Sequence, residues 1–211
     1  MAQLSEDILA LVTPKTYMPG EILFRQGESA DEFFYLKSGL TQAFSLASDG
    51  RERIIITTWP QKTLAAGVFL RREKHRANEM VMRKSVIYTF PRPLAEKLMA
   101  ENAEFRSAVM DDMAFDVIVL CEQLADSALL DPQIKLSRFL CRRIRYGQCE
   151  KTALGYELEC TQEFIGKALG LSRATVNPAL SALASRGWLE LKYGRITITD
   201  YAAVSEFAYK D

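Results

Sequence analysis

The sequence has few of the side chains from which catalytic and metal sites are built. It contains one histidine, His75, and four cysteines, which are separated by 19, 7 and 10 residues. No Cys-x-x-Cys pair is present to hold zinc or an iron–sulfur cluster, so we expect ordinary reduced thiols at Cys121, Cys141, Cys149 and Cys160. With no metal-spaced cluster and no serine or cysteine beside an evident base, we expect a protein that is not an enzyme.

Long apolar runs and targeting signals are also missing. No stretch approaches twenty uninterrupted apolar residues, and the first residues, MAQLSEDILALVTPK, lack the charged start and apolar core of a signal peptide. We therefore expect a cytoplasmic protein without a membrane partner. The 48% hydrophobic and 26% charged residues suffice for packed cores, and no low-complexity tract indicates disorder.

The formal net charge is zero, but it is unevenly spread. Residues 131–211 carry a net charge of +3, and residues 1–130 carry a net charge of −3. This mild asymmetry favours a C-terminal part that faces nucleic acid.

Residues 17–90 have the pattern of short strands separated by glycine turns. In PGEILFRQG, Ile22 and Phe24 alternate between two glycines, and Asp49-Gly50 is a hairpin signal before a β-branched run. Strands at roughly ten-residue spacing favour an antiparallel barrel or jelly roll. We therefore predict a β-barrel domain over residues 1–93, ending at the FPRP segment.

From about Leu94 to Ser127 the pattern is helical, with no glycine or proline. Apolar residues recur at alternating spacings of three and four, the seam along which two helices pack: Met110, Met113, Val117, Leu120 and Leu124. A second apolar stripe consists of Ala114, Ile118, Cys121 and Ala125. Because a long helix with two apolar faces needs two surfaces to bury them, we predict that one face packs on the barrel and the other forms a dimer interface. The alternative is that the seam packs on its own barrel.

Asp131-Pro132 interrupts this helix and marks a natural hinge, which places a dimerisation helix at 94–130 and a third domain at 131–211. The next predicted helix carries a basic stripe that either lies along phosphates or is a solvated face: Lys135, Arg138, Arg142 and Arg145. Further on, KYGRITIT predicts a hairpin around Tyr193-Gly194, and Asp200 can cap a short last helix.

The segment TQEFIGKALGLSRATV predicts two helices joined by a tight turn. Thr161 can cap the first helix, Gly170 permits the turn, and Ser172 can cap the second helix. Apolar residues at helical spacing form the inner faces: Ile165, Leu169, Val176, Leu180 and Leu183. A helix-turn-helix followed by a β-hairpin wing is typical of DNA-binding domains.

The order of barrel, long helix, hinge and winged helix-turn-helix resembles the CRP/FNR family, the catabolite-activator and fumarate–nitrate-regulator type of bacterial transcription regulators. PGEILFRQGESADEFFYLKSG resembles the opening strands of its cyclic-nucleotide-binding-like barrel, and TQEFIGKALGLSRATV resembles its DNA-binding motif. The resemblance covers essentially the whole chain. It implies an α+β fold with an antiparallel β-barrel or jelly roll, a dimerisation helix and a C-terminal winged helix-turn-helix. It also implies a homodimer, a near-palindromic double-stranded DNA site and RNA polymerase as a partner.

The resemblance assigns DNA contacts to individual positions. Ser172 and Thr175 match positions that contact phosphate, as do Thr161 and Gln162 at the start of the first helix. Arg173 matches a base-reading position, where a guanidinium can pair with guanine O6 and N7.

Two departures from the family pattern lie on the second helix. Ala174 stands where the family often has Glu, and Pro178 replaces a second reading arginine, so the family's customary half-site is not expected. Proline in a helix interior costs roughly 3 kcal/mol, but here it lies just beyond the first turn, and we predict a kinked continuous helix. The alternative starts the helix at Pro178 with Asn177 as its N-cap. In both cases Asn177 lies one turn from Arg173, where its amide can read adenine, while the proline ring can touch a thymine methyl.

The region TLAAGVFLRREKHRAN matches the cassette with which family members bind cyclic AMP. Residues 63–70 contain no acidic side chain, and Arg76 is followed by Ala77 rather than a hydroxyl residue, so we expect no cyclic AMP, although Arg76 can still meet an anion. Charged neighbours predict that His75 lies at the surface and that no haem is bound. The family's iron–sulfur cluster needs cysteines near the N-terminus, and none precedes Cys121. An unidentified small molecule in the barrel, a redox or protein signal, or no effector at all remain open.

The sequence thus predicts a homodimeric, sequence-specific DNA-binding transcription regulator controlled by an unidentified effector in its barrel. The alternative is a sensor or binding protein whose altered winged helix contacts protein instead of specific DNA. Steep salt dependence of binding to a defined duplex separates the two, because neutralising phosphates releases counterions.

Overall fold

The computed structural model describes residues 3–210, apart from the side chains of residues 128 and 129. By its internal contacts the chain divides into two compact units, Met1–Cys121 and Glu122–Asp211. The division suggested by the sequence, 1–93, 94–130 and 131–211, stays a prediction, and its residues 1, 2 and 211 lie outside the described residues.

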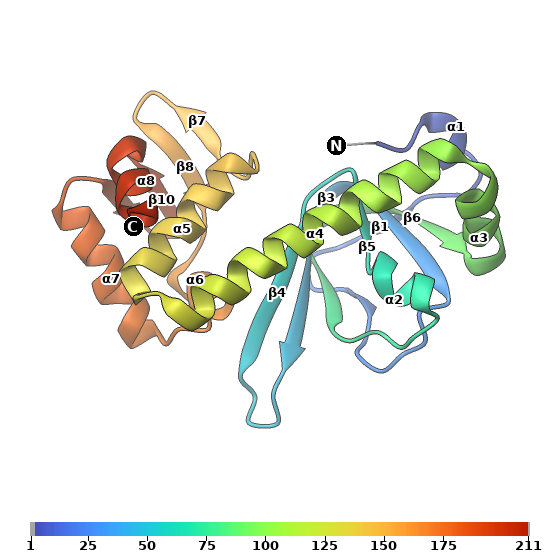
Figure 1. Ribbon diagram of the computed structural model, residues 1–211, viewed down its shortest axis with the longest axis horizontal. Coiled ribbons are helices and arrows are strands. Elements are labelled where there is room, and N and C mark those ends of the chain that lie inside the picture. The colour runs from blue at the N-terminus through green and yellow to red at the C-terminus, as the bar shows by residue number, and fades with distance from the viewer. Residues whose placement is uncertain (1–2, 211) are drawn as a thin grey trace. The chain divides into compact units, whose positions relative to one another are not determined.

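The first unit is an antiparallel sheet with helices (Figure 1). Its elements are α1 (Glu6–Leu9), β1 (Lys15–Tyr17), β2 (Ile22–Phe24), β3 (Glu32–Leu46), β4 (Glu52–Thr58), β5 (Lys62–Leu64), α2 (Ala66–Arg71), β6 (Asn78–Pro91), α3 (Arg92–Glu101) and most of α4 (Ala103–Leu129). The strands pair in the order β1-β6-β3-β4, with β2 on β6 and β5 on β3. The predicted antiparallel β-domain is confirmed, and among the described residues its pairing path does not close into a ring.

Two glycines shape β3. Gly50 has a φ of +84°, and its N–H donates to the carbonyl of Ala47 (2.9 Å) in the turn that joins β3 to β4, as the Asp49-Gly50 signal predicted. Gly39 has a φ of +102°, and a Cβ there would lie 2.1 Å from the Oγ of Ser85 on β6. Only glycine permits this approach of the two longest strands.

Buried aromatic rings join the sheet to its helices. Phe33 of β3, Phe69 of α2, Phe90 of β6 and Phe105 of α4 are each at most 1% exposed. The ring centroids of Phe33 and Phe105 lie 5.0 Å apart, and those of Phe90 and Phe105 lie 5.7 Å apart. Each fully buried ring contributes about 1.5–3 kcal/mol, so this cluster holds the start of α4 against the sheet.

The prediction of one continuous helix from Leu94 to Ser127 is wrong at Asn102. The backbone there is extended (φ −106°, ψ 111°), α3 ends before it, and α4 begins at Ala103. The side-chain Oδ1 of Asn102 accepts a hydrogen bond from the N–H of Phe105 (2.8 Å), which is an N-cap. Because the apolar spacing continues across Asn102, the sequence pattern does not reveal this break.

The second unit begins with the last turns of α4 and contains two antiparallel hairpins (Figure 1). Its other elements are α5 (Pro132–Arg145), β7 (Glu150–Thr152), β8 (Gly155–Glu159), α6 (Gln162–Leu169), α7 (Arg173–Ser185), β9 (Leu189–Lys192), β10 (Arg195–Ile198) and α8 (Tyr201–Tyr209). The sheet order is β7-β8-β10-β9. The hairpin around Tyr193-Gly194 and the cap at Asp200, whose Oδ1 accepts from the N–H of Ala203 (2.9 Å), are confirmed. The hairpin β7–β8 was not predicted.

Membrane spans require long apolar helices. Among the helices of residues 3–210, none combines the length and apolar run that a crossing needs.

Candidate DNA-binding surface and sensor cavity

Side-chain caps hold both helices of the helix-turn-helix. At α6, Thr161 Oγ1 accepts a hydrogen bond from the N–H of Phe164 (3.1 Å). At α7, Ser172 Oγ accepts one from the N–H of Thr175 (3.2 Å). Gly170 ends α6 in the left-handed conformation, with a φ of +67°. Both predicted caps and the predicted glycine turn are therefore confirmed.

A second glycine lets α6 and α7 approach. The N–H of Leu171 donates to the carbonyl of Gly166 (2.9 Å), and a Cβ on Gly166 would lie 2.8 Å from the Leu171 carbonyl oxygen. The predicted inner-face residues are all buried: Ile165, Leu169, Val176, Leu180 and Leu183. The packing of this core fixes which side of α7 is left for a ligand.

Helix α7 runs without interruption from Arg173 to Ser185, with Pro178 inside it. The prediction that the helix continues through the proline is confirmed, and the alternative with Asn177 as N-cap is wrong, because Ser172 caps the helix. The amide that proline lacks would have paired with the carbonyl of Ala174. The helix therefore loses one bond close to its start.

The predicted DNA-contact residues lie mostly at the surface. The exposed ones are Thr161, Gln162, Ser172, Arg173, Asn177 and Pro178. Thr175 is half-buried, and its Oγ1 lies 2.9 Å from the Oγ of Ser172. The caps thus use the same hydroxyls that were predicted to meet phosphate.

Arg173 has an acidic partner that the sequence analysis missed. Its Nη2 donates to Oε2 of Glu163 on α6 (2.7 Å), and Glu163 also pairs with Lys167 (3.2 Å). Bonds to Lys167 and Arg173 hold the pKa of the Glu163 carboxyl below its usual range. The carboxylate therefore orients the guanidinium in the absence of a ligand. The two residues lie on different helices, so no sequence spacing signals the pair.

A cleft of about 300 Å³ separates the helix-turn-helix from the wing, and its lining includes Gln162, Arg173, Lys192, Tyr193 and Arg195. Tyr193 is fully exposed at the tip of the β9–β10 wing. Lys192 pairs with Glu190 (3.1 Å), and Arg195 pairs with Glu157 (3.1 Å).

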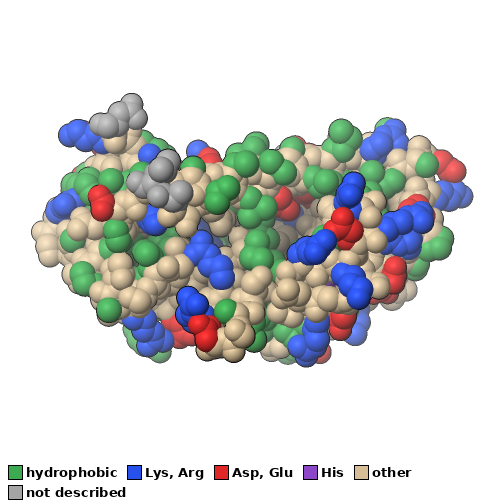
Figure 2. Space-filling model, turned by 60° about the horizontal axis from the view of Figure 1, so that its bottom comes forward, with side chains coloured by type: hydrophobic (Ala, Val, Ile, Leu, Met, Phe, Trp, Pro, Cys, Tyr) green, Lys and Arg blue, Asp and Glu red, His purple; other side chains and the backbone are tan. Residues whose placement is uncertain are grey.

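Acidic and basic side chains also lie next to one another, without a field of one sign, on the face of the molecule drawn in Figure 2. Non-specific attraction to phosphate is therefore weaker than the count of basic residues suggests.

Side chains of the basic stripe on α5 bond to other residues of the second unit. Lys135 Nζ donates to the Ser127 carbonyl (2.8 Å). Arg138 and Arg142 both pair with the buried Asp126, the former at 3.1 Å. The solvated-face interpretation is wrong for Arg142, whose side chain is buried against the last turns of α4, and phosphate binding by the stripe stays a prediction.

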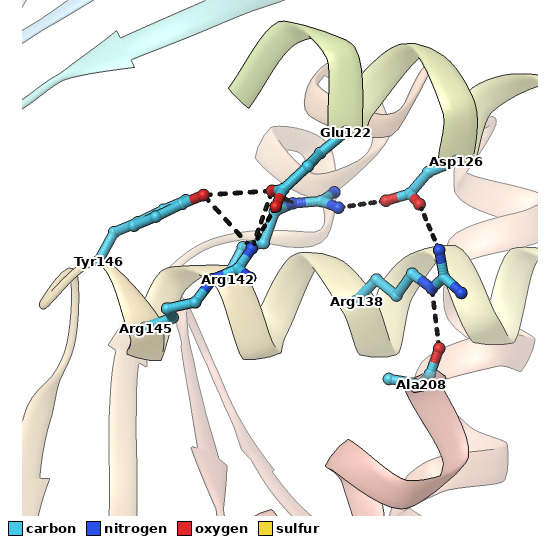
Figure 3. A network of polar contacts seen from close by, with 7 residues as sticks. All are labelled: Glu122, Asp126, Arg138, Arg142, Arg145, Tyr146 and Ala208. Atoms are coloured by element: carbon cyan, nitrogen blue, oxygen red, sulfur yellow. Dashed lines mark hydrogen bonds and ion pairs between the residues drawn. The ribbon is translucent and has the colours of Figure 1, made fainter. Parts of the chain in front are cut away.

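Figure 3 shows the second half of this network, in which side chains of α5 point toward Glu122 on α4. Arg145 Nη2 donates to both carboxylate oxygens of Glu122 (2.7 and 2.8 Å), and the Tyr146 hydroxyl donates to Oε2 (3.2 Å). Arg138 also donates to the Ala208 carbonyl of α8 (2.8 Å). The sequence signal was present, since Glu122 and Asp126 are acidic residues four apart on α4.

The first unit contains a cavity of about 320 Å³ whose walls are mostly apolar. Strands β2 to β6, α2 and the middle of α4 line it, and its titratable side chains are His75, Arg76, Glu79 and Asp116. Burial raises the pKa of Glu79 to about 8 and that of Asp116 to about 7. The sequence analysis missed both carboxyl groups, because neither lies in the segment that matches the cyclic-nucleotide cassette.

The surface position predicted for His75 is wrong. The side chain is 4% exposed, and its ring stacks on that of Phe24, with centroids 3.7 Å apart. Burial lowers the pKa of His75, which favours the neutral imidazole. Arg76, predicted as a possible effector contact, also lines the cavity, and it is paired with Glu73 (2.6 Å).

The predicted interface residues of α4 are largely exposed. Met110, Val117, Leu120 and Leu124 are between 40% and 72% exposed, whereas Met113 is half-buried against the core. The second stripe was expected to pack on the barrel, but its side chains are exposed as well: Ala114, Ile118, Cys121 and Ala125. Instead, the face of α4 that packs on the first unit's core consists of Phe105, Ala108 and Val109.

Comparisons with known proteins agree with this architecture. A family model described as a cyclic nucleotide-binding domain matches residues 14–102, and one described as a Crp-like helix-turn-helix domain matches residues 134–207. The CRP-like cAMP-activated global transcriptional regulator of Mycobacterium tuberculosis is 25% identical over 188 residues, which are 89% of this chain and 84% of the relative. The anaerobic regulatory protein of Pasteurella multocida is 21% identical and covers 92% of this chain and 71% of the relative.

Solved structures share the fold. The CRP-family transcriptional regulator TTHB099 of Thermus thermophilus superposes with a TM-score of 0.78 at 20% identity, over 92% of this chain and 96% of that one. The c-di-GMP-responsive global regulator CLP of Xanthomonas campestris gives a TM-score of 0.81 at 15% identity, over 92% of this chain and 97% of that one.

A cyclic-nucleotide-binding-type domain followed by a winged helix-turn-helix defines a class of DNA-binding transcription regulators. The order of these domains, together with the curated relatives, assigns the chain to one family within that class. It belongs to the CRP/FNR family of transcription regulators.

Proposed function

We propose that this chain is a homodimeric, sequence-specific DNA-binding regulator whose sensor cavity takes a small-molecule effector. The observation that carries the DNA-binding part is the capped, continuous helix α7, which presents Arg173 and Asn177 at the surface. In the structural class of helix-turn-helix proteins, the N-terminal residues of the second helix contact base edges in the major groove.

The proposed base contacts differ from those of a recognition helix that contacts bases through two arginines. Arg173 pairs with guanine O6 and N7, and Asn177, one turn further, pairs with adenine N6 and N7. Pro178 offers only an apolar ring, which contacts a thymine methyl. Phosphates are held by Gln162 and by hydroxyls at the two helix starts, those of Thr161, Ser172 and Thr175, because each lies beside the positive end of a helix dipole.

Dimerisation through α4 is supported by the solvent-exposed apolar side chains of this helix. Leu124 is 72% exposed and Val117 is 58% exposed, and they lie seven residues apart, at the heptad spacing of helix pairs. Two copies related by a two-fold axis place two α7 helices on successive major grooves and so require a near-palindromic site. RNA polymerase is the expected partner of the DNA-bound dimer, and the cytoplasm is its expected location.

Cyclic AMP, haem and an iron–sulfur cluster are not the proposed effectors. Arg76, which was predicted as a possible anion contact, is paired with Glu73, and two carboxyl groups stand in the cavity wall. The ring of His75 is stacked on Phe24 and buried. The alternative function, in which the winged helix contacts protein, has less support, because the capped helices and their packed inner faces are intact.

Selection of bound sites from random duplexes tests DNA binding, symmetry and the code together. We expect a near-palindrome whose half-site prefers guanine at one position and adenine close by. Asn177→Ala is expected to remove the adenine preference, and Pro178→Arg is expected to add a guanine preference. Selection without any enriched sequence, at a salt concentration where binding persists, would contradict the proposal.

The oligomeric state in solution tests the proposed homodimer. Leu124→Lys with Val117→Lys places charges in the predicted interface, and light scattering is expected to show monomers where the parent chain forms dimers. Leu11→Lys, at an exposed leucine of the first unit outside the predicted interface residues, is the matched control and should leave the dimer intact. A parent chain that is monomeric at micromolar concentration would contradict dimerisation.

A further inference from the structure

The sensor cavity has an unusual distribution of charge. Its walls are mostly apolar, and the acidic side chains among them, Glu79 on β6 and Asp116 on α4, face one cavity. They lie close enough that the charge of Asp116 contributes to the raised pKa of Glu79. When they are ionised, two carboxyl groups in one apolar wall repel a phosphate and attract a cation.

Buried polar atoms in this wall have no partner within the protein. Glu79 is 3% exposed, and its Oε1 makes no hydrogen bond with any described residue. The same holds for Nδ1 of His75, which is 4% exposed and lines the same cavity. An unsatisfied buried polar group costs about 1–3 kcal/mol in general, so a wall with two such groups fits a ligand that completes them.

The basic side chains near the cavity already have acidic partners. Lys62 Nζ lies 2.8 Å from Oδ1 of Asp112 and 4.0 Å from the centre of the Phe115 ring. Arg76 is bound to Glu73 (2.6 Å) and is mostly exposed. Each of these two basic side chains is therefore bound to another carboxylate, Asp112 or Glu73, although the charge of Lys62 also acts on Asp116.

We propose that the effector is a small organic cation with an apolar body, and that the carboxyl groups of Glu79 and Asp116 bind its protonated nitrogen. This inference rests on the proposed function, since it names the effector class of the sensor cavity. The apolar side chains that surround the carboxyls, among them Ile56, Val68 and Leu120, take the body of the ligand. Among the described residues, no group of three or more His, Cys, Asp or Glu side chains is placed to hold a metal ion, which favours an organic cation over a metal.

Binding of such a cation is coupled to protons. At neutral pH Glu79 holds a proton because its pKa is about 8, and Asp116, with a pKa of about 7, holds one in part of the molecules. The ammonium group replaces these protons, so affinity rises with pH between about 6 and 9 and then levels off. The other titratable groups in the cavity wall are His75 and Arg76 on the loop before β6, and Lys62 on β5 and Asp112 on α4 act on Asp116. Strands β3 and β4 contribute only uncharged side chains to the cavity wall.

The experiment uses the full-length protein and matched probes of one shape: 2-phenylethylamine, 2-phenylethanol and phenylacetate, with cyclic AMP as a fourth ligand. Titration calorimetry at pH 8 is expected to show binding of the amine that is about tenfold or more tighter than binding of the alcohol, with no binding of the two anions. Repeating the titration in buffers of different ionisation enthalpy should show proton release.

Two variants locate the site. Glu79→Gln and Asp116→Asn are each expected to weaken amine binding about tenfold or more and to reduce the released protons. Glu101→Gln removes an exposed carboxylate outside the cavity and should leave affinity unchanged. Unfolding curves of each variant show whether a loss of binding reflects a loss of fold, and ring currents on the Phe24 and His75 protons in NMR spectra report occupancy directly.

The outcomes separate this inference from the proposed function. Equal binding of amine and alcohol, tighter binding of either anion, tighter binding of Zn²⁺ than of the amine, or no binding by the amine overturns the cation proposal. Failure to select a DNA site without any probe overturns the proposed function and leaves the cavity result standing. Amine binding that does not change DNA affinity supports the ligand class and contradicts its role as effector.

Discussion

Replacing Asp126 with asparagine tests what holds the end of α4 to α5. The Asp126 side chain is 5% exposed, and it pairs with Arg142, whose side chain is 8% exposed. With asparagine at 126, the nearest carboxylate to Arg142 is Glu122, 4.0 Å away and partly exposed. Leaving a buried charge without its partner costs about 3–5 kcal/mol. The second pair of Asp126, with the more exposed Arg138, adds at most about 1 kcal/mol.

A loss of this size is a large fraction of the roughly 5–15 kcal/mol that stabilises a domain. The chain has two tryptophans, Trp59 in the first unit and Trp188 in the second. In a Trp59→Phe background, urea unfolding followed by the remaining tryptophan reports the second unit. We expect the free energy of unfolding to fall by about 3–5 kcal/mol in Asp126→Asn.

Two controls sharpen the test. Glu122→Gln breaks the pair with Arg145, which is about half exposed, and is expected to cost less than about 1 kcal/mol. Asp126→Leu with Arg142→Met removes both buried charges and should recover most of the stability, because the penalty comes from the unpaired charge. The reasoning fails if Asp126→Asn costs less than the Glu122 control, or if the double variant is no more stable than Asp126→Asn.

Two other substitutions test separate sites. Because burial raises the pKa of Glu79 from its ordinary value of 4.5 to about 8, the folded chain keeps a proton that the unfolded chain has lost. The contribution of Glu79 to stability should therefore be fully present below about pH 4.5 and be lost as the pH rises through 8. Urea unfolding at pH 5 and pH 9 is expected to show a stability difference that is smaller in Glu79→Gln than in the parent protein, by up to about 5 kcal/mol. The same difference in both proteins would contradict this expectation. Glu163→Gln frees Arg173, so the preference for guanine at its position should drop several-fold while affinity for random DNA rises. Glu190→Gln removes a carboxylate from the wing and should tighten binding to the selected site and to random DNA equally. Fluorescence anisotropy measures both affinities. If the two variants behave alike, Glu163 does not orient Arg173.

The helix-turn-helix could be predicted because its signals are local. Caps at Thr161 and Ser172, the turn at Gly170 and the apolar spacing of the inner faces each act within a few residues, and they agree with one another. The continuation of α7 through Pro178 was predictable for the same reason, because a cap at Ser172 places the proline just beyond the first turn of the helix.

The wrong and missing predictions have a common physical cause. The spacing of residues in the sequence identifies a face of a helix or strand, but it does not identify what that face contacts. The basic stripe of α5 has the spacing of a phosphate-binding surface, yet Arg138 and Arg142 bond to Asp126 of the preceding helix. His75 lies among charged neighbours in the sequence, but the fold turns it inward onto Phe24. Glu79 is an acidic residue in a strand pattern, and nothing local indicates that its carboxyl is buried.

Side-chain bonds cross the corner between α4 and α5. Asp131-Pro132 has the local signals of a hinge, and the backbone of Asp131 is extended (φ −61°, ψ 151°) before α5 begins at the proline. Yet the ion pairs of Asp126 and the bond from Lys135 to the Ser127 carbonyl cross this corner. Opening it would separate the buried ion pair of Asp126 and Arg142.

In the proposed regulator, we expect an effector signal to act on α4 before this corner. The chain divides between Cys121 and Glu122, within α4 itself, so the last two turns of that helix belong with the DNA-binding unit. Asp116 lines the sensor cavity one and a half turns before that boundary, on the same helix. Because Asp116 lies on the helix that continues into the second unit, we expect a ligand of the proposed kind to act through α4.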